Sequence, residues 1–153
     1  MAPIVRLFGP VDGVLGAEVG IGEVLVVEVL LLVLVVGNFL TRFLAHSRHR
    51  HQAEDGPEAV SRVLPHEVAN VVLIVVSLYY LTLDAHAGMV MSVLVLTLFL
   101  TDFFEFEARK AEARRDVPLD RPKGALAAGV VAFAYAAYQV VFFIIDGYLA
   151  AVI

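Results

Sequence analysis

Hydrophobic residues make up 60% of this 153-residue chain and charged residues 18%, against about 45–50% and about 25% in ordinary globular domains. A soluble fold this small buries only about two-thirds of its chain surface, so the apolar excess must face lipid. The absence of cysteine excludes disulfides and thiolate metal sites, and the net charge of −5 argues against nucleic acid as a partner.

Residues 1–21 are predicted to form an N-terminal extracellular or interfacial segment. Their apolar run is too broken for a signal peptide, and Pro10 argues against one continuous helix. One apolar face would suit a segment lying on the membrane surface. Its members are Ile4, Leu7, Phe8, Val11, Val14 and Leu15.

Residues 22–153 are predicted to form a four-helix transmembrane domain. The expected spans are 22–44, 67–84, 88–106 and 124–146, joined by cytoplasmic loops at 45–66 and 107–123. Strands are excluded because these runs do not alternate apolar and polar residues, and an open sheet edge is not tolerated in lipid. The predicted fold class is therefore all-α, an integral membrane four-helix bundle.

The second and third spans are short for a hydrocarbon core of about 30 Å. The uncharged residues 68–83 cover only about 24 Å as a helix. Three explanations are open. The bilayer thins locally, or the turn at 84–88 sinks below the outer surface, or Asp102 and Glu105 rise from the inner surface.

Basic residues predict the orientation. Ten of the eleven lie within residues 42–66 and 102–123, which comprise the two predicted loops and the adjoining ends of the spans, and only Arg6 lies elsewhere. Because positive charge is retained in the cytoplasm, both termini are expected outside the cell membrane. The first loop is predicted to be a polar linker, whereas the second should continue the third helix past the bilayer until Pro118 and Pro122 end it.

Acidic groups at the outer end form a candidate ion or proton site. Glu28 lies about 21 Å along its helix from Arg42, which is less than the hydrocarbon thickness. With Asp84, His86 and Asp146 it could hold a proton or a hard divalent cation. The alternative is an ordinary polar rim in which Glu28 is solvated or protonated.

The inner rim carries a second set of ionisable residues. They are His46, His49, His51, His66, Glu67, Asp102 and Glu105. His46 and His49 could share a helical face, but no H-E-x-x-H pattern occurs and the neighbouring arginines would repel a cation. A solvated loop that binds lipid headgroups is therefore the preferred interpretation.

Two features predict helix packing. Asn38 and Asn70 are expected to hydrogen-bond between helices, with Gln139 in a similar role. A seam of small residues in the last span would allow close backbone approach, either inside the bundle or in a dimer. It comprises Gly124, Ala128, Ala132 and Ala136, widened by Ala125 and Gly129.

The sequence contains no phosphate-binding loop, no nucleophile elbow and no pair of histidines suited to haem. We therefore predict no catalytic residue, no metal site and no cofactor. Nine arginines against two lysines, sixteen acids and no cysteine are typical of a salt-loving archaeal protein. The stretches YYLTLDAHAGMVMSVLVLTLFLTDFFEFEARK and VPLDRPKGALAAG resemble a family of small four-span membrane proteins of halophilic archaea, catalogued as a domain of unknown function. That resemblance implies no activity.

Three functions are compatible with these features. The preferred hypothesis is a non-enzymatic accessory or scaffold subunit of a membrane assembly, with the lipid bilayer and a homo-oligomer or larger complex as partners. The alternative is a cation or proton carrier that uses the outer acidic cluster. An intramembrane enzyme is the least favoured, because no nucleophile and base are paired.

Overall fold

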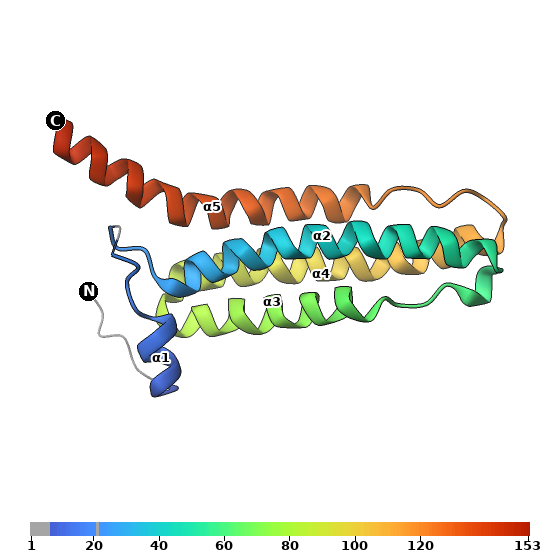
Figure 1. Ribbon diagram of the computed structural model, residues 1–153, viewed down its shortest axis with the longest axis horizontal. Helices are drawn as coiled ribbons and strands as arrows, with labels where there is room; N and C mark the ends of the chain where they lie inside the picture. The colour runs from blue at the N-terminus through green and yellow to red at the C-terminus, as the bar shows by residue number, and fades with distance from the viewer. Residues whose placement is uncertain (1–6, 21) are drawn as a thin grey trace.

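The computed structural model describes residues 7–20 and 22–153. This part of the chain consists of helices and irregular connections, and its one β contact is an isolated bridge between Glu18 and Leu25 (Figure 1). The predicted all-α class is confirmed. The elements are α1 (Pro10–Leu15), α2 (Val26–Glu54), η1 (Pro57–Ala59), α3 (Leu64–Leu83), α4 (Ala85–Arg114) and α5 (Lys123–Val152). Residues 1–6 and 21 of the predicted N-terminal segment, including Ile4 and Arg6, lie outside the described residues.

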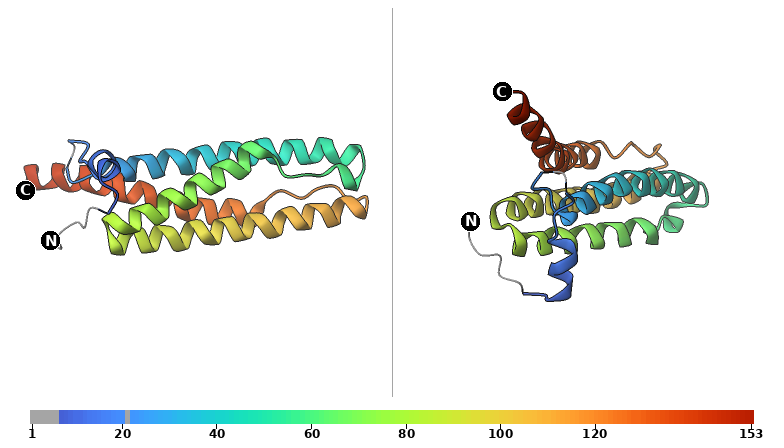
Figure 2. Two further views of the ribbon diagram at one scale, coloured as in Figure 1. Left: turned by 90° about the horizontal axis from the view of Figure 1, so that it is seen from below. Right: turned by 60° about the vertical axis from the view of Figure 1, so that its left-hand side comes forward.

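The four long helices run antiparallel to their chain neighbours and form one elongated bundle (Figures 1 and 2). The α3–α4 turn, α1 and the C-terminus lie at one end, which we call the turn end. The connections 55–63 and 115–122 lie at the other, which we call the loop end. All four helices are long and apolar enough to cross a membrane.

Two helices are longer than the predicted spans. α2 continues to Glu54, so the expected linker at 45–66 is helical over its first part. The reason is that Ala45 and His49 keep the core spacing of the helix and remain buried, although their neighbours are polar. α5 likewise continues past Asp146 to Val152.

A carboxylate lies at the start of α2, of α4 and of α5. The Glu28 carboxylate accepts a hydrogen bond from the backbone N–H of Leu25 at 2.8 Å, at the start of α2. Asp84 caps α4 by accepting from the N–H of Ala87 at 2.9 Å. At the start of α5, Oε1 of Glu105 accepts from the N–H groups of Gly124 and Ala125. A carboxylate satisfies the unpaired N–H groups at such an end and complements the helix dipole.

The core is a stripe of buried residues spaced alternately three and four apart on α2, α3 and α4, as in a coiled coil. Towards the turn end the stripe is apolar and includes Leu31, Val35, Leu73, Met91 and Val95. Towards the loop end the same stripe becomes polar. Its buried polar members there are Asn38, Arg42, His49, His66, Asn70, Asp102 and Arg109.

Large apolar side chains cover the outside of the bundle on all four long helices. Examples are Val33, Leu40, Val75, Leu100 and Val130, each at least half exposed. Soluble monomers rarely expose such continuous apolar surface. An apolar exterior around a polar stripe fits a bundle that is solvated by lipid.

The small residues of α5 face the other helices. Its buried residues are Ala125, Gly129, Ala132 and Ala136, whereas Gly124 is exposed and Ala128 is half-buried. The reason is the helical repeat of 3.6 residues per turn. The buried residues are spaced four, three and four apart and stay on one face, whereas residues spaced only by four shift progressively around the helix. The seam therefore packs inside this bundle, against α2 and α4.

Gly129→Leu should destabilise the bundle. A Cβ at this position would lie 2.9 Å from Cζ of Phe39 and 3.7 Å from Nη1 of Arg42, and overpacking a filled site costs about 1–3 kcal/mol or more. Gly147→Leu on the same helix is the matched control, because a Cβ there meets nothing within 4 Å. Thermal unfolding in mild detergent should show a clear loss for Gly129→Leu alone. Equal melting temperatures for the two variants would contradict this packing.

Candidate functional site

Asp102 on α4 is the centre of a buried polar network between α2, α3 and α4, in the half of the bundle near the loop end. Its Oδ2 accepts hydrogen bonds from Nε2 of His66 at 3.0 Å and from Nδ2 of Asn70 at 3.1 Å. Its Oδ1 lies 3.4 Å from Nε of Arg42. Asn38 extends the network by donating from Nδ2 to Oδ1 of Asn70 at 2.7 Å. Asn38 and Asn70 thus join α2 to α3.

His66 is held at both ring nitrogens. Its Nδ1 lies 2.9 Å from the hydroxyl oxygen of Thr41, which in turn lies 3.1 Å from the backbone oxygen of Asn38. When the imidazole is neutral, Thr41 can donate to Nδ1. When it is doubly protonated, Nδ1 can donate to Thr41 while Thr41 donates to Asn38. Rotation of one hydroxyl therefore satisfies either charge state of His66.

Arg42 carries unused hydrogen-bonding capacity. Its side chain is 1% exposed, and Nη1 and Nη2 have no hydrogen-bond partner among the described residues. Oδ1 of Asn38 is also buried without a partner there. An unsatisfied buried polar group costs about 1–3 kcal/mol. The network is therefore incomplete on the side of Arg42 that faces α5, where its Nη1 approaches Gly129.

A second polar layer follows one to two turns nearer the loop end. Nη1 of Arg109 lies 3.3 Å from Nδ1 of His49, and Nε2 of His49 lies 2.9 Å from the backbone oxygen of Ser61. Nη2 of Arg109 lies 3.9 Å from Oε2 of Glu105. This layer ties the connection after α2 to α4, and its apolar support is the small cluster of Val60, Phe106 and Ala113.

The depth of the Asp102 network follows from helix geometry. Asp102 and His66 each lie seventeen residues from the ends of α4 and α3 that meet at the turn, so both are about 26 Å from that turn. This distance is slightly less than the thickness of a hydrocarbon core, about 30 Å.

The expectation of a solvated inner rim is therefore wrong for part of that set. His49, His66 and Asp102 are buried, whereas His51 is exposed and His46, Glu67 and Glu105 are partly buried. In the sequence analysis Arg42 and Arg109 were counted with the charges of the loops, but both are buried in the structure. The signal that identifies them is their position on the three-and-four stripe, because Arg42 follows Leu31, Val35 and Asn38 at that spacing.

The four outer candidates have different surroundings in the structure. Glu28 is buried, and its Oε1 accepts a hydrogen bond from the hydroxyl of Tyr80 at 2.5 Å. Asp84 uses its carboxylate to cap α4, and the side chains of His86 and Asp146 are exposed. Within residues 7–20 and 22–153, no three His, Asp or Glu residues come close enough to hold a metal ion. The feature at the turn end is thus a Glu28–Tyr80 pair.

The short helix α1 covers part of the turn end. Its Asp12 is buried and accepts hydrogen bonds from the hydroxyl of Tyr79 at 2.6 Å and from the N–H of Phe8 at 2.7 Å. The rings of Phe8 and Tyr79 pack edge to face. Other apolar residues of this segment, Leu7, Val11 and Val14, are exposed, so its apolar face remains available to a membrane surface.

These features define a class, an all-helical bundle whose four long helices have the length and apolarity needed to cross a membrane and whose core is polar at one end. The chain belongs to the family described as "Domain of unknown function (DUF7313)", which matches residues 2–153. No curated protein and no solved structure matches the chain.

Proposed function

We propose that this chain is a multi-pass membrane protein with both termini outside, and that it is a non-enzymatic subunit that binds a partner membrane protein through α5. The composition, rich in acids and in arginine over lysine, supports an origin in a salt-loving archaeon. The observation that carries the subunit role is that the second half of α5 has no buried residue.

The second half of α5 is less covered by the rest of the bundle than its first half. No residue of the helix after Ala136 is buried, and the ribbon diverges from α2 towards the C-terminus (Figure 1). A ladder of aromatic rings runs along this part, with Tyr138 and Phe142 5.0 Å apart between ring centroids. These two rings are 53% and 45% exposed.

α5 is too long for lipid alone to cover its whole apolar surface. Its 30 residues extend about 45 Å, whereas the hydrocarbon core is about 30 Å thick. Its last turns are still apolar, with Tyr148 73%, Leu149 51% and Val152 83% exposed. These turns would project into water outside the membrane unless another protein covers them. A partner helix with a basic or hydrogen-bonding group would also complement the exposed carboxylate of Asp146.

Site-specific photocrosslinking tests this role. A photoreactive phenylalanine analogue in place of Tyr148 should give one discrete adduct with a different protein in native membranes. The same analogue in place of Phe104, an exposed aromatic residue on α4, is the control and should label lipid only. Adducts with a second copy of this chain would assign the surface to a homo-oligomer. No protein adduct at Tyr148 would exclude the subunit role.

The orientation gives a separate prediction. All ten basic residues of the described chain lie in the half of the bundle near the loop end, so that end should be cytoplasmic. Because the chain has no cysteine, a single introduced cysteine is its sole site of thiol labelling. In intact cells a membrane-impermeant maleimide should label His86→Cys at the turn end and should label Glu58→Cys only after permeabilisation. Labelling of Glu58→Cys in intact cells would reverse the topology.

A cation or proton carrier is the second candidate. The ionisable groups at the turn end, Glu28, Asp84, His86 and Asp146, suggest it from the sequence. At the opposite end, the buried contact between His66 and Asp102 adds support. Proteoliposomes with a trapped pH-sensitive dye test it. A proton flux that falls on His66→Gln would favour the carrier, and no flux from the unaltered protein would exclude proton carriage.

A further inference from the structure

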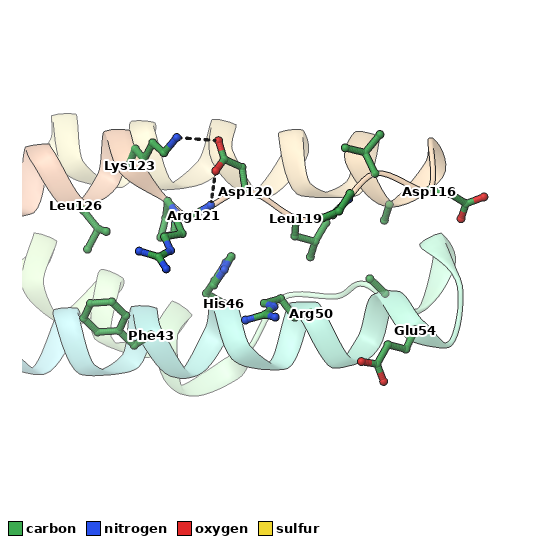
Figure 3. A pocket seen from close by; sticks show the side chains of 15 residues that line it. Phe43, His46, Arg50, Glu54, Asp116, Leu119, Asp120, Arg121, Lys123 and Leu126 are labelled. Carbon is green, nitrogen blue, oxygen red and sulfur yellow. Dashed lines mark hydrogen bonds and ion pairs between the residues drawn. The ribbon is translucent and has the colours of Figure 1, made fainter.

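A cavity of about 1200 Å³ lies at the loop end, between the last part of α2 and the connection that leads into α5 (Figure 3). Phe43 and Leu126 line the end nearer the middle of the bundle. His46 and Arg50 of α2 lie opposite Arg121 of the connection. The cavity is separate from the Asp102 network, whose residues do not line it.

Only some of the charged side chains that line this cavity have an ion-pair or hydrogen-bond partner. Lys123 lies 3.5 Å from Asp120, and Asp120 also accepts a hydrogen bond from the backbone N–H of Arg121 at 2.8 Å. The hydrogen bond from the Arg121 backbone and the charge of Lys123 hold the pKa of Asp120 below its usual value, and both contacts engage its carboxylate locally. Figure 3 shows the Asp120 carboxylate turned towards Lys123, while the Arg121 side chain extends towards α2.

Two guanidinium groups are left without a carboxylate. Among the described residues, neither Arg50 nor Arg121 takes part in a side-chain ion pair or hydrogen bond. Nδ1 of His46, between them in Figure 3, is buried and also has no partner there. The remaining acids of the lining, Glu54 and Asp116, lie at the far end of the cavity.

Arg42 lies behind the cavity wall and adds positive charge there without lining the cavity. It lies one helical turn from His46, on the same face of α2, and its two terminal nitrogens are buried without partners in the described chain. The cavity thus has guanidinium groups on two facing walls, Arg50 on α2 and Arg121 on the connection, and apolar side chains at its inner edge. Guanidinium groups match the oxygens of a phosphate in charge and in their forked geometry.

We propose that the cavity between α2 and the 115–122 connection binds a phosphate group, with Arg50 and Arg121 as its charged ligands and His46 as a further hydrogen-bonding group. An anionic lipid headgroup and free phosphate share this chemistry. Phe43 is 56% exposed at the edge that faces the membrane, where it would lie beside the acyl chains of a bound lipid.

The test uses the full chain in detergent at constant ionic strength, with two separate probes. One is inorganic phosphate, compared with chloride. The other is phosphatidylglycerol in mixed micelles, compared with phosphatidylcholine. Binding is measured as a concentration-dependent rise in melting temperature and by native mass spectrometry. A response to phosphatidylglycerol alone assigns the site to a lipid headgroup, and a response to inorganic phosphate assigns it to the free anion.

The variants separate a site from general attraction. Arg50→Gln with Arg121→Gln should weaken binding of the responding probe by about tenfold or more, since charge-assisted hydrogen bonds are lost. Arg48→Gln with Arg115→Gln removes the same charge from exposed residues outside the lining and should change binding less than about twofold. Arg121→Lys, which keeps the charge without the fork, should fall between them. No response to either probe, or equal losses in the two double variants, would overturn the proposal.

Discussion

Gly88→Ala should open the α3–α4 hairpin and give one of the largest stability losses of any single methyl group added to this chain. A Cβ on Gly88 would overlap the backbone N and Cα of Leu81. A backbone cannot relieve an overlap by changing rotamer, so the two helices must move apart at their closest approach. Overpacking of this kind costs about 1–3 kcal/mol and occasionally more.

Gly37→Ala is the matched control for this variant. Gly37 is also inside a long helix, but a Cβ there meets nothing within 4 Å. Alanine is favoured over glycine in a helix by about 0.5–1 kcal/mol, so this variant should unfold at the same or a higher temperature. The two melting temperatures in one detergent should therefore move in opposite directions. A neutral Gly88→Ala would show that α3 and α4 are not in contact at this point.

The close approach at Gly88 explains how α3 and α4 reverse direction with Asp84 alone between them. Asp84 ends one helix and caps the next, while Gly88 allows the second helix to lie directly against the first. Sequence reasoning identified the turn from its charge but not this contact. The reason is that a glycine within an apolar run gives no sign of which backbone approaches it.

Hydropathy predicted the number and order of the long helices, because apolar runs report which parts of a helix can face lipid. It did not predict where α2 ends. The segment from Ala45 to Glu54 is polar, yet it is helical because α4 continues beside it and buries Ala45 and His49. A helix that leaves the hydrocarbon core keeps its core spacing but loses its apolar exterior. The spacing of buried residues is therefore the better guide to its end.

The candidate site was partly visible in the sequence. Asn38 and Asn70 were expected to join helices, and they hydrogen-bond directly. The Asp102 network was missed because the ionisable residues at the loop ends of the spans, Arg42 and Asp102 included, were taken as solvated. The pairing of Arg42 with Asp102 and of His66 with Asp102 joins three helices, and hydropathy carries no information about such long-range contacts.

Asp102→Asn should destabilise the bundle strongly, because it leaves Arg42 as a buried charge without a counter-ion. Both side chains are nearly inaccessible, with 1% exposure for Arg42 and 5% for Asp102. Removing one partner of a buried ion pair costs about 3–5 kcal/mol, since the other charge remains desolvated. The amide keeps the shape of the carboxylate, so the loss reports charge rather than a cavity. Equilibrium unfolding in detergent measures it.

Two further variants show whether the lost charge pair is the cause. Glu107→Gln removes an acid from exposed ion pairs with Arg62 and Lys110, and it should cost less than about 1 kcal/mol. Arg42→Met added to Asp102→Asn removes the unpaired charge and should restore part of the stability, because an apolar replacement for a buried pair is often neutral. Arg42→Met alone is measured as well. If the stability loss of the double variant equalled the sum of the losses of Asp102→Asn and Arg42→Met, the two residues would act independently. Their contact would then contribute nothing to the fold, and the polar stripe would be stabilised by His66 and Asn70 instead.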